Sequence, residues 1–345
     1  LNPGNDKYSV KYYKGLGTST PKEAKEYFKA LKLVKYTTDE THDDESLYLA
    51  FDKKENSSNN RKEWLSNYDC ENTLDYDSSQ VSVTDFVNKD LIHFSVSDNI
   101  RSIPSVIDGL KPSQRKVLFC CMKRKLYDKE IRVAQLAGYV SEHGAYHHGE
   151  MSLYGTIVNM AQDFVNSNNI PLLVPIGQFG TRIMGGKDSA QPRYIHTKLQ
   201  KITGQIFDNH DSPLLKYKKD DGLSIEPNYY VPILPMILIN GTQGIGTGWS
   251  TEIPKFSPLN IIKNIKLYLE NKPMKEMKPC YLGFKGSITK KSNNIYLSKG
   301  IYDLKENKIL VRELPIGVWT DNFKNHLESL TIDPKNKSKK QIIRY

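Results

Sequence analysis

Residues 178–197 read QFGTRIMGGKDSAQPRYIHT and place Arg193 directly before Tyr194. A phenol has a reference pKa of about 10, so a tyrosine that acts as a nucleophile needs a neighbouring positive charge to stabilise its oxyanion. The guanidinium of Arg193 can supply that charge. The alternative is a structural tyrosine, because most tyrosines pack the ring and tether the hydroxyl. The pair makes Tyr194 a candidate nucleophile for covalent catalysis.

The same segment alternates glycines with cations. The glycines are Gly177, immediately before the segment, and Gly180, Gly185 and Gly186 within it, and the cations are Arg182, Lys187 and Arg193. A backbone without side chains can approach a polyanion closely, and its N–H groups favour negative charge. We therefore expect this loop to wrap round a phosphodiester, with Arg182 and Lys187 among its contacts.

A second segment, EHGAYHHGE at residues 142–150, is rich in histidine. Its histidines are His143, His147 and His148. The spacing of four between the first two suggests zinc, but Gly144 and Gly149 interrupt the helix that such a motif needs. The other interpretations are a packed structural pair, and an imidazole that faces a scissile phosphate and donates a hydrogen bond or helps to remove the tyrosine proton.

Positive charge is unevenly distributed along the chain. The 345 residues carry a net charge of +10. Residues 1–100 contain 13 basic residues (Lys and Arg) and 18 acidic ones (Asp and Glu). Residues 101–200 contain 13 basic and 7 acidic residues, and residues 201–345 contain 23 and 14. The excess begins where the histidine-rich and glycine-rich segments begin, which indicates an anionic partner for that part of the chain.

Several classes are excluded by composition. No apolar run of 18 residues is present, so we expect no membrane partner. The cysteines form no CxxC pair and indicate a reduced intracellular protein: Cys70, Cys120, Cys121 and Cys280. The length favours two or three domains. The chain begins at Leu1 without methionine and inside a motif, so we expect a fragment of a larger protein.

The elements that must position these residues follow from periodicity and punctuation. We expect a helix after Thr18 or Ser19 as N-cap, a polar loop over residues 37–80 with one helix at RKEWL, and solvated acids in that loop at Asp39, Asp43, Asp44 and Glu45. The remaining expectations are helices near 112–124, 133–140, 149–165 and 260–271, and strands at 172–178, 194–199, 286–289 and 308–313. Three short helices followed by two strands are typical of a winged helix.

An ordered series of motifs carries a family resemblance. It includes KYYKGLGTS, NIRSIPSVIDGLKPSQRKVL, AYHHGE, GQFGTR, GGKD, RYI and PILPMILINGTQGIGTGWS. In this order the motifs resemble the central DNA breakage-reunion region of eukaryotic-type (type IIA) DNA topoisomerase II. The resemblance implies an α+β multidomain fold. Residues 1–80 would be the C-terminal part of the metal-binding TOPRIM α/β domain and a linker, 81–230 a winged-helix (helix-turn-helix) domain with the catalytic tyrosine, and 231–345 part of an α/β tower domain.

The resemblance also implies a reaction. Tyr194 would attack a DNA phosphorus, form a 5′-phosphotyrosyl link and free a 3′ hydroxyl, before strand passage and religation. Arg101, Arg193 and His148 would surround the attacked phosphate, with Arg101 as a bidentate clamp on the transition state.

Further residues are expected to bind DNA. Lys111, Arg115 and Lys116 in GLKPSQRKV would grip flanking phosphates. His147 and Thr156 would lie beside the cleavage site, where Thr156 could equally be a hydroxyl that lines its own helix. Ile245 in QGIGTGW would be a wedge between base pairs, although most such isoleucines are core residues.

The resemblance implies Mg²⁺ and, in the full-length enzyme, ATP. The acidic cluster that precedes KYYKGLGTS in the family is absent, so we expect the metal ligands upstream of Leu1 and a fragment that binds DNA but cleaves it poorly alone. The expected partners are double-stranded DNA and a second identical copy of the chain, in the nucleus. Two alternatives remain: a winged-helix DNA-binding module without chemistry, and a zinc-dependent hydrolase built on the histidines.

Overall fold

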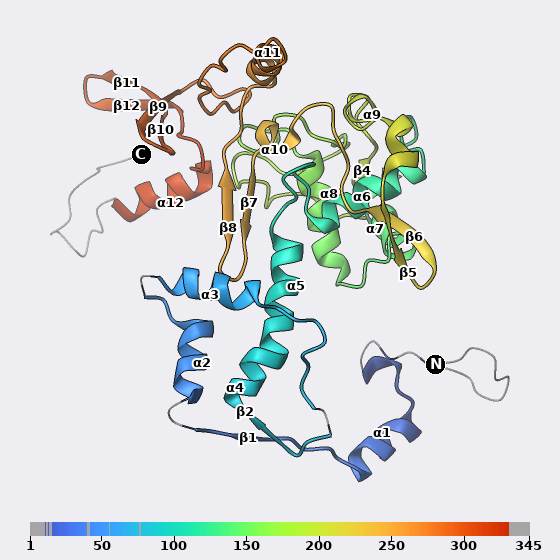
Figure 1. The fold of residues 1–345 in the computed structure, drawn as a ribbon. Coiled ribbons are helices and arrows are strands. Elements are labelled where there is room, and N and C mark those ends of the chain that lie inside the picture. Colours follow the sequence, from blue (N-terminus) through green and yellow to red (C-terminus); the bar gives the residue numbers. More distant parts are fainter. Residues whose placement is uncertain are drawn as a thin grey trace. The chain divides into compact units, whose positions relative to one another are not determined.

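The computed structural model describes Lys11, Tyr13 and residues 16–39, 42–54, 56–75 and 77–330. The chain forms two compact units, Leu1–Ser97 and Asp98–Tyr345. Figure 1 shows the elements of both. The break between the units lies after Ser97, whereas the sequence suggested a boundary between residues 80 and 81.

The first unit is mostly helical. Its elements are η1 (Leu16–Thr18), α1 (Pro21–Lys29), β1 (Lys35–Thr37), α2 (His42–Phe51), α3 (Ser57–Ser66), β2 (Gln80–Ser82), α4 (Val83–Phe86), η2 (Val87–Leu91) and the start of α5 (Ile92–Ser102). Strands β1 and β2 pair in parallel. Thr20, not Thr18 or Ser19, caps α1, and its hydroxyl accepts a hydrogen bond from the Glu23 backbone N–H.

A small apolar cluster explains where the first unit ends. Trp64 and Leu65 of α3 pack with Val87 and Ile92, and Val87 is fully buried. The residues that lead from η2 into α5 therefore bury their apolar side chains in this unit, and the unit extends to Ser97 instead of ending near residue 80.

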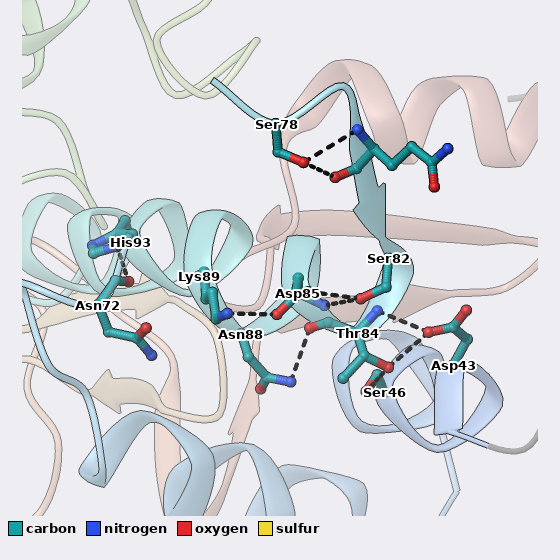
Figure 2. Close-up of polar contacts among 11 residues, drawn as sticks. Asp43, Ser46, Asn72, Ser78, Ser82, Thr84, Asp85, Asn88, Lys89 and His93 are labelled. Carbon is teal, nitrogen blue, oxygen red and sulfur yellow. Dashed lines mark hydrogen bonds and ion pairs between the residues drawn. The ribbon is translucent and has the colours of Figure 1, made fainter. Parts of the chain in front are cut away.

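Asp43 is a structural acid, and the expectation that it lies in a solvated loop was wrong. It lies in the first turn of α2, in a stretch predicted to be irregular, and it is only 4% exposed. Its Oδ1 accepts hydrogen bonds from the Thr84 hydroxyl at 2.7 Å and from the Thr84 backbone N–H at 2.9 Å (Figure 2). The hydroxyl bond, followed by one from the Asp39 backbone, holds the pKa of Asp43 below its usual range.

The second unit joins a helical part to a series of hairpins. Its elements after α5 are α6 (Pro112–Lys123), β3 (Ile131–Arg132), α7 (Val133–His143), α8 (Glu150–Ala161), β4 (His196–Thr197), α9 (Thr203–Ile206), η3 (Asn209–Leu214), β5 (Tyr217–Asp220), β6 (Leu223–Pro227), α10 (Met236–Ile239), β7 (Thr242–Ile245), β8 (Ser250–Ile253), α11 (Pro258–Leu269), β9 (Ser287–Ser292), β10 (Ile295–Lys299), β11 (Ile301–Lys305), β12 (Lys308–Glu313) and α12 (Thr320–Leu330).

The core of the second unit lies among α6, α7 and α8, which are grouped together in Figure 1. Its fully buried side chains include Leu118, Leu136 and Ile157, at the helical spacing that the sequence predicted. Cys120 and Cys121 lie in the same core, and burial raises the pKa of the Cys120 thiol to about 12. These helices form the rigid support for the loops that carry the candidate site.

The sheets of the second unit are small and antiparallel. Strand pairs are β3–β4, β5–β6, β7–β8, β9–β10 and β11–β12. The two strands expected at 172–178 and 194–199 reduce to β4 and to isolated bridges such as Ile176 with His196. Within the described residues, no helix is long and apolar enough to cross a membrane.

Candidate active site and nucleic-acid interface

Tyr194 lies on a turn that is fixed to the start of α7. The carbonyl of Pro192 accepts a hydrogen bond from the Ala134 N–H at 3.1 Å, and the carbonyl of Ile195 accepts one from the Val133 N–H at 3.0 Å. Ile195 is buried, whereas Tyr194 is 65% exposed. The turn is therefore anchored on both sides of the tyrosine, and its ring projects toward solvent. The interpretation of Tyr194 as a packed core ring does not fit this exposure.

Arg193 provides the positive charge beside Tyr194. Its guanidinium carbon lies 4.8 Å from the centroid of the Tyr194 ring. A cation at this distance from an aromatic ring is attracted to it by about 0.5–1 kcal/mol at an exposed site. The two side chains are thus held near one another, as a phenolate nucleophile requires.

The glycine-rich loop is shaped by contacts within the protein. A Cβ on Gly180 would lie 2.6 Å from the Gly186 backbone, and a Cβ on Gly186 would lie 2.3 Å from the Gln162 amide nitrogen. That nitrogen donates to the Phe179 carbonyl at 2.8 Å. Thr181 closes the loop through two hydrogen bonds to Asp188. These glycines therefore serve the close packing of the loop on itself, a role that the phosphodiester interpretation did not anticipate.

Arg182 has partners inside the protein in this structure, and its contact with DNA stays a prediction. Its guanidinium pairs with the Glu313 carboxylate and donates to the Leu314 carbonyl at 2.8 Å. Glu313 is almost fully buried, so releasing Arg182 to solvent or DNA would leave a buried unpaired charge. Lys187, by contrast, is exposed on the same loop.

Arg115 and Lys116 also form ion pairs with buried acids, and their contacts with DNA phosphates stay predictions. Arg115 is 3% exposed, and its Nε and NH2 donate to the Asp108 carboxylate at 2.7 and 2.9 Å. Lys116 donates to Glu226 at 2.8 Å and to the Gly144 carbonyl at 2.6 Å. Lys111, the residue before α6, lines a polar cavity instead.

His143 ends α7, His147 and His148 lie on the loop between α7 and α8, and the three have separate partners. His147 Nε2 lies 2.7 Å from Asp220 Oδ2 on the β5–β6 hairpin. His148 is exposed and packs edge-on against the Tyr146 ring, with the ring centroids 5.4 Å apart. The His143 ring packs against Tyr139. The three imidazoles are engaged with different neighbours, which disfavours a shared zinc ion.

Arg101 and Thr156 each have a local partner. Arg101, near the end of α5, donates from Nε and NH2 to Asp98 Oδ1 at 3.0 and 2.9 Å while its side chain stays exposed. The Thr156 hydroxyl donates to the Ser152 carbonyl one turn earlier in α8. This bond is the one expected if the Thr156 hydroxyl lines its own helix, which was the alternative to a DNA contact. The approach of Arg101 and His148 to an attacked phosphate stays a prediction.

Ile245 ends β7 and is 72% exposed. Its flanking glycines face the other way: a Cβ on Gly244 would lie 2.3 Å from the Ser102 carbonyl oxygen, and one on Gly246 would lie 1.9 Å from Asn99 Oδ1. Because neighbouring strand residues point to opposite faces, packing Gly244 inward directs Ile245 outward. Asn99 also exchanges two hydrogen bonds with the Thr247 backbone, which fixes the hairpin tip.

The described part of the chain contains no group of three or more His, Cys, Asp and Glu that could hold a metal ion. The Asp43 carboxylate accepts a hydrogen bond from the Thr84 hydroxyl, and the Asp108 carboxylate forms an ion pair with Arg115. These acids do not fit a Mg²⁺ site, because their oxygens already accept hydrogen bonds within the fold.

Two family comparisons together match most of the chain. Residues 101–345 match the A-subunit family of DNA gyrase/topoisomerase IV, and residues 2–99 match the C-terminal associated domain of TOPRIM. Curated relatives include the probable DNA topoisomerase 2 of Dictyostelium discoideum, 50% identical over 337 residues, and DNA topoisomerase 2 of Arabidopsis thaliana, 51% identical over 333 residues. Each match covers 94% of this chain but 22% of the relative, so the chain spans less than a quarter of their length.

A solved structure is similar over nearly the same span. The DNA-binding, cleavage and re-ligation domain of Plasmodium falciparum topoisomerase II matches with a TM-score of 0.76 and 48% sequence identity, over 93% of this chain and 44% of that one. The two share a mixed α/β fold with small antiparallel sheets.

Proposed function

Because the chain belongs to the DNA topoisomerase II family, we propose that it forms the DNA breakage-reunion core of a type IIA topoisomerase. Its substrate is double-stranded DNA, which it cuts by transesterification and rejoins after strand passage. Tyr194 carries the proposal: its phenol is exposed on an anchored turn with the Arg193 cation against its ring.

The finer architecture is part of the same proposal. Residues 1–97 form the C-terminal part of the TOPRIM domain and its linker. Residues 98–230 form a winged helix of α6, α7 and α8, in which β3, between α6 and α7, pairs with β4 after α8. Residues 231–345 form part of the tower. The apolar core among α6, α7 and α8 and the antiparallel register of Arg132 with His196 support this assignment.

The reaction exchanges one phosphodiester for another. The Tyr194 hydroxyl oxygen bonds to phosphorus, the bond from phosphorus to the 3′ oxygen breaks, and the 3′ hydroxyl leaves with a proton. Arg193 favours the phenolate, His148 accepts the phenol proton or donates to the phosphate, and Arg101 neutralises charge on the transition state. Religation is the reverse attack by the 3′ hydroxyl, and it needs no energy source because the covalent link retains the phosphodiester energy.

The remaining parts of the proposal concern the whole protein. Mg²⁺ bound by acids outside the described residues would polarise the phosphate, and ATP would drive strand passage. A homodimer is required because each Tyr194 cuts one strand. We propose a nuclear location from the eukaryotic relatives, although one of them is named DNA topoisomerase 2, mitochondrial.

The polarity of the covalent link tests the proposal. The protein, supplied with the acidic metal-binding segment and Mg²⁺, is denatured with detergent during reaction with a labelled duplex. A 5′-phosphotyrosyl link predicts that label at the 3′ end of the cut strand stays with the protein, while label at the 5′ end is released. Adduct of the opposite polarity contradicts the mechanism, and DNA binding without adduct points to a binding module without chemistry.

Ile245 gives a second test in which binding and bending are separated. Ile245→Ala is expected to reduce the protein-induced bend of a duplex, because an inserted apolar side chain unstacks a base step and kinks DNA by about 20–90°. Energy transfer between dyes at the duplex ends measures the bend. Ile233→Ala removes the same atoms from another exposed isoleucine and serves as the control. Equal bending by both variants removes the wedge role from Ile245.

A further inference from the structure

Lys255 lies in the wall between two cavities of the second unit. The larger, about 650 Å³, is lined by residues of β8, β9 and β10, together with Tyr281. The smaller, about 460 Å³, lies between the start of α6, α8 and the base of the β7–β8 hairpin. Thr242, Gln243 and Lys255 line both cavities.

The ammonium of Lys255 has no carboxylate partner among the described residues. Its Nζ lies 5.8 Å from the centroid of the Tyr281 ring. Burial lowers the pKa of Lys255, and no neighbouring charge offsets this. The stem of the side chain is confined, because a Cβ on Gly241 would lie 3.1 Å from Lys255 Cγ. A half-buried cation without an anion is unfavourable, so this position favours an anionic ligand.

The smaller cavity is positively charged. Its charged lining residues are Asp108, Lys111 and Lys255. Asp108 is fully buried, and its oxygens accept hydrogen bonds from Arg115 and from the Leu110 backbone N–H. The structure describes no ion pair for Lys111. Two lysines therefore line a polar cavity whose single acid is neutralised by another residue, and such a pair suits a phosphate group.

The cavity is linked to the hairpin tip by strand geometry. Gln243 lines the cavity, and Ile245 stands two residues further along β7. Residues two apart in a strand point to the same face, so the exposed Ile245 side chain and the cavity-lining Gln243 side chain share one face of the hairpin. A duplex that receives Ile245 between its bases would meet the face of the hairpin that also carries the cavity-lining Gln243.

We propose that the smaller cavity binds a phosphate group of the DNA backbone, held by Lys255 and Lys111 beside the base step that Ile245 opens. The source of the phosphate rests on the proposed function. The affinity of the cavity for phosphate does not, because it follows from the two ammonium groups alone.

Chemical footprinting tests the site directly. The chain is acetylated at lysine with and without a saturating duplex, and separately with inorganic phosphate, and modification is read by mass spectrometry. We expect Lys255 acetylation to fall in proportion to the fraction of DNA-bound protein, while Lys305 on the β11–β12 hairpin is modified as before. Protection by phosphate but not by DNA overturns the backbone assignment, and protection by neither overturns the site.

Salt dependence gives the second readout. The slope of log K against log salt concentration falls by about 0.9 for each backbone phosphate contact that is lost. We expect this loss for Lys255→Met, retention of the slope for Lys255→Arg, and no change for the charge-matched control Lys305→Met. Thermal unfolding of each variant establishes that the fold is kept. A Lys255→Met slope equal to that of Lys305→Met contradicts the proposal.

The two levels of the proposal fail in different ways. If the unmodified chain does not bind duplex DNA at low salt, the proposed function fails, and the phosphate arm of the footprint still tests the cavity. If the chain binds DNA but Lys255 is neither protected nor needed for the salt slope, only the cavity site fails.

Discussion

Tyr194→Phe is expected to abolish the covalent protein–DNA adduct while DNA affinity changes by less than about tenfold, or 1.4 kcal/mol. The substitution removes the attacking oxygen and keeps the ring against the Arg193 guanidinium. Loss of a nucleophile in other covalent enzymes lowers turnover by on the order of 10⁴- to 10⁶-fold, so adduct should fall below detection. Detergent trapping measures the adduct, and a filter or gel assay measures binding.

The matched control is Tyr229→Phe. Tyr229 is another exposed tyrosine of the second unit, so its variant removes the same hydroxyl from a similar environment. Both proteins are compared with the acidic segment and Mg²⁺ supplied. Equal adduct from Tyr194→Phe and the unsubstituted protein would assign the nucleophile to another residue, and the proposed reaction would lose its central group.

Arg115→Met is expected to destabilise the second unit by about 3–5 kcal/mol, because it leaves the Asp108 carboxylate buried without its cation. Arg115 donates three hydrogen bonds, two to Asp108 and one to the Leu110 carbonyl. Asp108 Oδ2 also accepts the Tyr230 backbone N–H at 2.9 Å, so the pair ties α6 to the segment after β6. Chemical denaturation followed by circular dichroism measures the free energy of unfolding.

Lys123→Met on the exposed face of α6 is the control, and changes at such surface sites are usually within about 0.5 kcal/mol. The same two variants discriminate the structural role of Arg115 from the phosphate role that its motif suggested. A phosphate contact predicts weaker DNA binding and a shallower salt slope with stability unchanged. Unaltered stability in Arg115→Met would contradict the ion-pair interpretation, and a shallower salt slope in the same variant would support the phosphate contact.

Local features of the fold could be predicted from the sequence because their causes are local. Helices α6 and α7 were predicted to within a few residues of their observed ends. The signals are Pro112 at a helix start, the helical spacing of apolar residues such as Leu118, and the break at Gly144. The stretch between α1 and β2 was predicted only in part: the helix at RKEWL is α3, whereas α2 was not expected. Helix α2 depends on a distant partner, since Asp43 needs Thr84, 41 positions away, to satisfy its carboxylate.

The candidate site, too, was predicted from the sequence only in part. The pairing of Tyr194 with an adjacent cation and the exposure of Ile245 between glycines were predicted, because neighbours in sequence create both features. Asp220, which contacts His147, and Lys255 were missed. No short motif contains either residue, and each gains its surroundings from elements far along the chain.

The sequence by itself determined the family, the identity of the candidate nucleophile and the helices that support it, since ordered motifs and helical periodicity are written in adjacent residues. Only the tertiary structure decided which cations pair with acids inside the fold. Arg115, Lys116 and Arg182 pair with acids 7, 110 and 131 positions away. An ion pair depends on distance in space and on burial, and neither quantity is specified until the chain has folded.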